Sequence, residues 1–124
     1  MCSYKNEGDD TKLNMLKPKL VDQNLSSEEL ISKLFVNNSF YYTILWNKVY
    51  RADLWNDIKF PEGYVHEDEA VIHIIYDRFN QLSTIANEFY HYRMVSNSIT
   101  HTNELIRKID YANALSLRLN YLYS

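Results

Sequence analysis

The stretch "HEDEAVIHIIYDRFN", residues 66–80, joins an acidic start to a strongly apolar segment and decides how the chain divides into elements. Apolar side chains recur every three or four positions from Val71 to Phe79. This is the spacing of a helix with one wide buried face. The pattern therefore predicts a helix over residues 67–80.

A second helix is predicted on the N-terminal side, in "LSSEELISKLF". Ser26 and Glu29 have the spacing of a capping box, and Leu25 and Leu30 lie where a hydrophobic staple would close. We therefore expect a helix over residues 27–35.

Several shorter segments read as extended chain or turns. Residues 40–50, "FYYTILWNKVY", are aromatic and β-branched and are expected to be extended, whereas "RADLWND" forms a short helix at most. "IKF" before Pro61 is expected to be a short strand because the residue before proline avoids helical conformations. Residues 61–63, "PEG", then form a turn. "LSTIA" and "EFYHYRM" are predicted to be two strands joined by a tight turn near Asn87.

A final helix is predicted from about Asn103, with Thr102 or Asn103 as its cap. Its expected buried stripe repeats every three or four residues: Leu105, Ile109, Ala112, Leu115, Leu119 and Leu122. Together the segments predict one α/β domain over residues 1–124, with a small mixed sheet and three to four helices and without a doubly wound repeat.

Composition excludes several classes of protein. The net charge of −3 without a basic block argues against a nucleic-acid-binding domain. The single cysteine, Cys2, allows no intrachain disulfide, which fits a reducing compartment. No apolar run approaches the roughly 20 residues of a membrane span, and the start lacks a secretory signal. A cytoplasmic location is expected, with contact to a membrane surface through a partner left open. Two glycines leave no Gly-rich phosphate loop.

The acidic run at the start of the central helix has two readings. Glu67, Asp68 and Glu69 can simply complement the helix dipole. Alternatively, the helix end presents a carboxylate to a substrate, because three adjacent acids can raise the pKa of one of them toward that of a general base. The helix end opposes that rise, and the sequence leaves both readings open.

Two further sets of residues could bind a ligand. Trp46, Asn47 and Lys48 place an aromatic face, an amide and an ammonium side by side, as sugar or phosphate binding requires. Trp46 could equally be core and Lys48 solvated. Arg93 ends a predicted strand and could clamp a phosphate, or be an ordinary surface arginine. A zinc site is disfavoured because no HExxH-like spacing joins the four histidines, His66, His73, His91 and His101.

Three segments in order, "WNKVYRADLW", "IKFPEGYVHEDEAV" and "EFYHYR", resemble the later part of bacterial family 2 glycosyltransferases that build capsular polysaccharides and exopolysaccharides. The resemblance extends from about Thr43 to Ser98, and it is loose elsewhere. It implies the C-terminal part of a GT-A-like fold and inverting transfer of a sugar from a nucleotide donor to a saccharide or lipid-linked acceptor.

The resemblance also implies roles for individual residues. The Asp of the family's acidic motif falls on Asp68, which would be the general base, with Glu67 orienting it or contacting the acceptor. Arg93 would meet the departing diphosphate. The remaining residues would bind or support the acceptor: His66, Glu69, Trp46, Asn47 and Lys48.

The N-terminal nucleotide-binding half of the family, with its Asp-x-Asp motif for Mg²⁺ or Mn²⁺, is absent from this sequence. "GDD" at residues 8–10 does not follow an apolar strand and is no replacement, whereas "MCSYK" is similar to the strand just after that motif. The chain is therefore expected to be inactive alone and to self-associate, because a divided sheet exposes an edge and an apolar face. The alternative is a protein-interaction module without chemistry.

Overall fold

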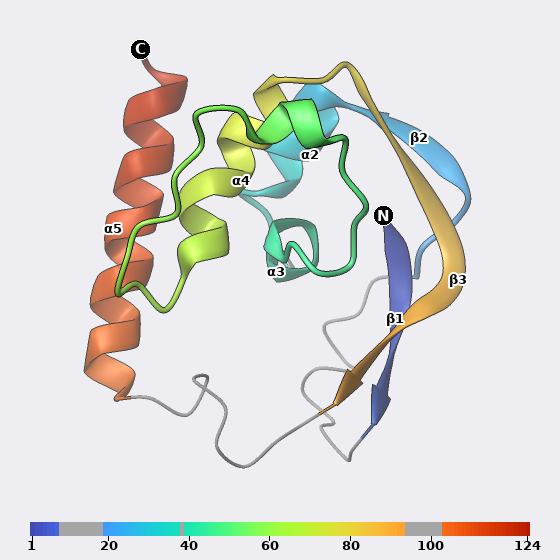
Figure 1. The fold of residues 1–124 in the computed structure, drawn as a ribbon, viewed down its shortest axis with the longest axis horizontal. Coiled ribbons are helices and arrows are strands. Elements are labelled where there is room, and N and C mark those ends of the chain that lie inside the picture. The colour runs from blue at the N-terminus through green and yellow to red at the C-terminus, as the bar shows by residue number, and fades with distance from the viewer. Residues whose placement is uncertain (8–18, 38, 94–102) are drawn as a thin grey trace.

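The computed structural model describes residues 1–7, 19–37, 39–93 and 103–124. In this part of the chain, a three-stranded mixed sheet lies on one side and four α-helices gather on the other (Figure 1). The predicted α/β class, with a small mixed sheet and about four helices, is confirmed.

The sheet has the order β1-β3-β2, with the long strand β3 (Gln81–Arg93) at its centre. Strand β1 (Cys2–Glu7) pairs with β3 in parallel, and β2 (Gln23–Ser26) pairs with it antiparallel. β2 covers the first four residues of β3, and β1 covers the remainder. The central strand β3 thus pairs in parallel with one neighbour and antiparallel with the other.

The predicted hairpin turn near Asn87 is wrong, because β3 continues through it. The register with β1 changes here: Cys2 is opposite Ile85, but Ser3 is opposite Glu88. The extra residues of β3, Asn87 among them, therefore form an irregularity of the bulge type. Figure 1 shows β3 as a strongly curved strand.

Helix α2 (Ser27–Lys33) confirms the predicted helix and its cap. The Glu29 N–H donates to Ser26 Oγ over 3.2 Å, and the Ser26 N–H donates to Glu29 Oε2 over 2.7 Å. Leu25 and Leu30 are both buried in the same cluster, as the staple requires.

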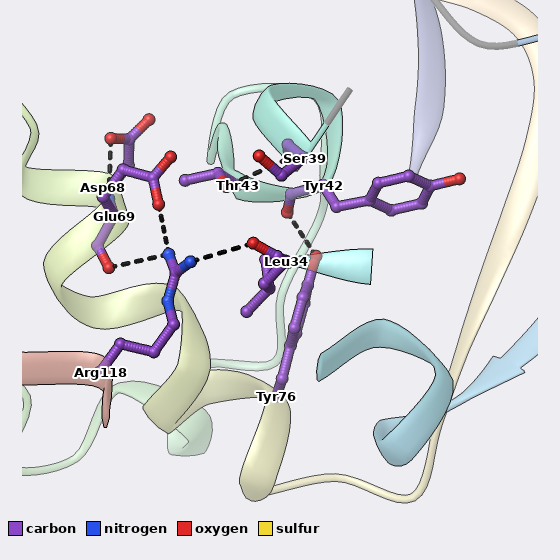
Figure 2. A network of polar contacts seen from close by, with 8 residues as sticks. All are labelled: Leu34, Ser39, Tyr42, Thr43, Asp68, Glu69, Tyr76 and Arg118. Atoms are coloured by element: carbon purple, nitrogen blue, oxygen red, sulfur yellow. Dashed lines mark hydrogen bonds and ion pairs between the residues drawn. The ribbon is translucent and has the colours of Figure 1, made fainter. Parts of the chain in front are cut away.

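The extended structure expected over residues 40–50 is wrong, because α3 (Ser39–Thr43) forms there. Thr43 Oγ1 donates back to the Ser39 carbonyl over 3.1 Å, and Tyr76 Oη on α4 donates to the Tyr42 carbonyl over 2.5 Å (Figure 2). Burial of the tyrosines against α4 therefore overrides their preference for strands.

The connection to α4 contains the predicted short helix as a 3₁₀ turn, η1 (Ala52–Trp55). The strand expected at "IKF" is wrong, because the Ile58 N–H donates to the Trp55 carbonyl in a turn. The predicted turn before α4 is confirmed, and Gly63 adopts a φ of +80° that favours glycine.

Helix α4 (Glu67–Asp77) confirms the central helix, although it ends three residues earlier than expected. Ile72, Ile75 and Tyr76 are completely buried. One cluster of the core lies between the sheet and the helices α2, α3 and α4, and the other lies between α4 and α5.

Helix α5 (Glu104–Leu122) is capped by the Asn103 side chain, which accepts from the Leu105 N–H over 2.9 Å. The buried stripe expected on α5 is wrong: it is half-buried at Leu115 and exposed at its other positions. Ala114 and Arg118 are buried instead. The cause is the ion pair of Arg118 with α4, which turns the other face of the helix inward.

Candidate functional site

The acidic run occupies the first turn of α4, as predicted, but its side chains diverge. His66 is the N-cap and makes no capping hydrogen bond with its side chain. Asp68 is half-buried, and its Oδ1 accepts the Glu69 N–H over 2.8 Å. Figure 2 shows the Glu69 carboxylate turned toward Arg118 and the Asp68 carboxylate lying away from that guanidinium. Glu67 is half-buried.

Glu69 forms a buried ion pair with Arg118 of α5 (Figure 2). Arg118 Nη2 donates to Glu69 Oε2 and, over 3.2 Å, to the Glu69 carbonyl, while Nη1 donates to the Leu34 carbonyl over 3.3 Å. This network fastens the start of α4 to α5 and to the end of α2. Glu69 is thus engaged in packing, and nothing in the sequence of α5 signals that Arg118 would be buried.

Lys48 is buried close to the acidic turn. Its Nζ donates to the Ile44 carbonyl and, over 2.8 Å, to Asn47 Oδ1. Asn47 Nδ2 in turn donates to the Tyr41 carbonyl over 3.2 Å. Burial lowers the pKa of Lys48 to about 7, and the negative charge of Asp68 partly opposes this. Asn47 and Lys48 therefore stabilise the segment after α3 and place an amine near Asp68.

Tyr50 is a third group beside Asp68. Burial raises the pKa of its hydroxyl, and the Asp68 charge raises it further. The charge of Asp68 on α4 thus acts on two groups of the segment before η1, Lys48 and Tyr50. Sequence reasoning missed Tyr50, whose only signal was its position two residues after Lys48.

Trp46 belongs to an aromatic cluster on the sheet. Its ring stacks on Tyr90 and Tyr92 of β3, with centroids 4.5 and 5.0 Å apart, and Tyr4 of β1 meets it edge-on at 4.9 Å. Because the Trp46 ring already stacks on other side chains of the protein, it contributes to packing in this arrangement and not to stacking on a sugar.

His66 faces the start of α5. Its ring lies edge-on to Tyr111, with centroids 5.4 Å apart, beside an open cavity of about 370 Å³. The other lining residues are Glu104, Arg107 and Lys108. Lys108 pairs with Glu104 over 2.7 Å, so the positive charge of this hollow is partly neutralised.

Arg93 is exposed as the last residue of β3, next to Glu7 of β1. The pKa of Glu7 is lowered mainly by its hydrogen bond with His91 and to a smaller extent by Arg93. In Figure 1, the end of β3 lies apart from the start of α4. The structure therefore does not bring Arg93 to Asp68.

The other predicted features divide between the core and the undescribed segments. His73 is buried against Tyr121, and burial lowers its pKa to about 4. Across the described ranges, no group of three His, Cys, Asp or Glu side chains is placed to hold a metal ion. Two regions singled out in the sequence, residues 8–10 and 96–102, lie outside the described residues.

A larger cavity of about 520 Å³, lined in part by Tyr50, lies between the start of β1 and the end of α4. Both of its arginines are engaged: Arg51 pairs with Asp53, and Arg78 donates to the carbonyls of Leu54 and Asn56. No pattern in the sequence indicates this cavity.

Comparison with protein-family models, curated proteins and solved structures finds no match to this chain. None of the described helices is long and apolar enough to cross a membrane. A functional assignment therefore rests on the residues themselves and on their arrangement.

Proposed function

We propose that this chain is the acceptor-binding and general-base portion of an inverting family 2 glycosyltransferase in cell-surface polysaccharide synthesis. The observation that carries the proposal is the electrostatic interaction of Asp68 with the buried groups Lys48 and Tyr50, which couples the acidic run to the "WNKVY" run. These runs belong to two of the three segments on which the resemblance depends.

In the proposed reaction, Asp68 accepts the proton of an acceptor hydroxyl. Its Oδ1 is held by the Glu69 amide, while Oδ2 makes no hydrogen bond within the described ranges and is the proton acceptor. The acceptor oxygen forms its bond to the anomeric carbon of the donor sugar from the opposite face. The bond to the nucleoside diphosphate breaks, and the diphosphate takes the electron pair.

In the proposed enzyme, the nucleotide-sugar site lies outside these 124 residues, in a matching half. That half would also supply the Asp-x-Asp motif for Mg²⁺ or Mn²⁺, since the described residues offer no such donor group. When bound, the metal would stabilise the leaving diphosphate. The chain alone is therefore inactive, and it works in the cytoplasm, at the membrane surface where lipid-linked acceptors are found.

Arg93 has no role in this proposal as the structure stands. Its position beside Glu7 places it at the end of the sheet, and contact with a diphosphate near Asp68 would need a different arrangement of this end. Trp46 and Glu69 act through packing, and His66 remains the acceptor contact predicted from the sequence.

The test joins this chain to the nucleotide-binding half of a family 2 enzyme and measures sugar transfer. Asp68→Asn should reduce turnover by at least about a thousandfold while donor binding, measured by calorimetry, stays within about twofold. Glu62→Gln, at an exposed acid in the turn before α4, is the matched control and should keep full turnover. Undiminished turnover by Asp68→Asn would refute the assigned base.

A second candidate function is that of an interaction module without catalysis. Two observations favour it: Asp68 bonds to the backbone of its own helix, and Arg93 lies elsewhere. An active joined enzyme would exclude this candidate. An inactive one that still binds donor, with wild-type and Asp68→Asn chains behaving alike, would favour it.

A further inference from the structure

Helix α5 carries an apolar stripe on the face opposite its contact with α4. The stripe has large exposed side chains near both ends: Leu105 is 65% exposed, Ile109 51%, Leu119 43% and Tyr123, the C-cap residue, 88%. Two small exposed residues, Ala112 and Ser116, lie between them. The helix is packed by Ala114 and Arg118, so this stripe is free.

The spacing of the stripe indicates what kind of partner fits it. Its six positions are separated by four, three, four, three and four residues: Leu105, Ile109, Ala112, Ser116, Leu119 and Tyr123. This alternation repeats every 3.5 residues and forms the narrow seam by which one helix packs against another. A second helix therefore fits the stripe better than a sheet or an extended peptide.

The order of side chains along the stripe matches itself in reverse. In an antiparallel pair centred on Ala114, Leu105 would meet Tyr123, Ile109 would meet Leu119, and Ala112 would meet Ser116. Large residues then lie opposite large ones, and the small central pair lets the helices approach closely. A surface that is complementary to itself under a two-fold rotation is the requirement for a symmetric dimer.

Charge also suits a second copy. The flanking positions are Ile106, Asn113 and Asn120 on one side and Lys108, Leu115 and Leu122 on the other. In the antiparallel pair Lys108 faces Leu122 rather than another Lys108, and Asn113 meets its own symmetry mate, so no like charges oppose each other. Antiparallel helices also oppose their dipoles favourably.

We propose that the chain forms a homodimer in which α5 packs antiparallel against α5 of a second copy. At 19 residues, α5 is about 28 Å long and holds fewer than three heptads. The dimer is therefore expected to be of moderate strength, with a dissociation constant of roughly 1–100 µM. The proposal does not depend on the transferase assignment.

Sedimentation velocity of the full chain over a concentration series tests the proposal. The average mass of wild type should rise toward twice that of the chain as its concentration approaches about 300 µM, and Ile109→Glu should weaken the dimer by at least about a hundredfold. Leu117→Glu is the matched control, because Leu117 is 46% exposed on the same helix but lies off the stripe. It should leave the dimer unchanged. A wild type that remains monomeric, or equal effects of the two variants, would overturn the proposal.

Disulfide trapping tests the direction of the helices and does not rely on the charged variants folding. In a Cys2→Ser background, Ala112→Cys combined with Ser116→Cys should give a covalent dimer under mild oxidation, because these positions face each other. Ala112→Cys alone should give little. Efficient trapping by the single variant would show a parallel pair, and no trapping by either would exclude the helix pair; both outcomes contradict the proposed interface.

Discussion

Replacing Arg118 by methionine should destabilise the whole domain, because this residue connects three helices. Methionine preserves most of the stem of the side chain and removes only the guanidinium group. The Glu69 carboxylate, 8% exposed, then stays buried without its partner, and the carbonyls of Glu69 and Leu34 each lose a donor.

The expected decrease in the free energy of unfolding follows from the burial of the Glu69–Arg118 ion pair. Breaking a buried ion pair by removing one partner costs about 3–5 kcal/mol, most of it the penalty of the charge left behind. For a domain of this length, that loss lowers the melting temperature by about 10–20 °C. It is a large part of the stability that single domains usually have.

A double variant separates the ion pair from simple packing. The double variant Glu69→Met with Arg118→Met removes both charges. Its free energy of unfolding should therefore lie less than about 2 kcal/mol below that of wild type. Lys108→Met, on the exposed face of the same helix, is the matched control and should change stability by less than about 0.5 kcal/mol. Urea unfolding followed by circular dichroism measures all three. A single variant within 1 kcal/mol of wild type, or a double variant as unstable as the single one, would refute this reasoning.

Two further predictions concern Lys48 and Ser26. Burial lowers the pKa of Lys48 from 10.5 to about 7 in the folded state, so between these values the unfolded chain binds more protons and stability rises with pH. Relative to Lys48→Met, wild type should gain up to about 1.4 kcal/mol per pH unit from pH 7 to 9.5 in urea unfolding; parallel pH curves would contradict this. Ser26→Ala removes the cap of α2 and should cost about 1 kcal/mol, whereas no loss in thermal unfolding would mean that the capping box contributes nothing.

Much of the fold was predictable where local signals agreed with tertiary packing. The capping box of α2, the acidic start of α4 and the Asn103 cap of α5 are short-range features, and each marks its helix correctly. The errors occur where a distant partner decides the conformation. Tyr41 and Tyr42 favour strands by propensity, yet contact with α4 holds them in α3.

The candidate site was less predictable, because it depends on which side chains turn inward. Nothing in the sequence distinguishes Glu69, which enters the core, from Asp68, which stays half-exposed. The inward turn is decided by Arg118, 49 residues later, and the same contact leaves most of the α5 side chains that were expected to be buried exposed. A buried arginine cannot be recognised from hydrophobic periodicity alone.

The central position of β3 also determines the order in which the chain can fold. Every pair between β1 and β3 joins residues more than 80 positions apart, for example Cys2 with Ile85 and Glu7 with Arg93. Contacts between residues this far apart in the sequence form late and slow folding. On the ribosome, β1 can form its ladder only after β3 has emerged, while α2 can form early from its own cap. β1 therefore stays open to misassembly until β3 is made, and a chaperone that shields it should raise the yield of folded protein.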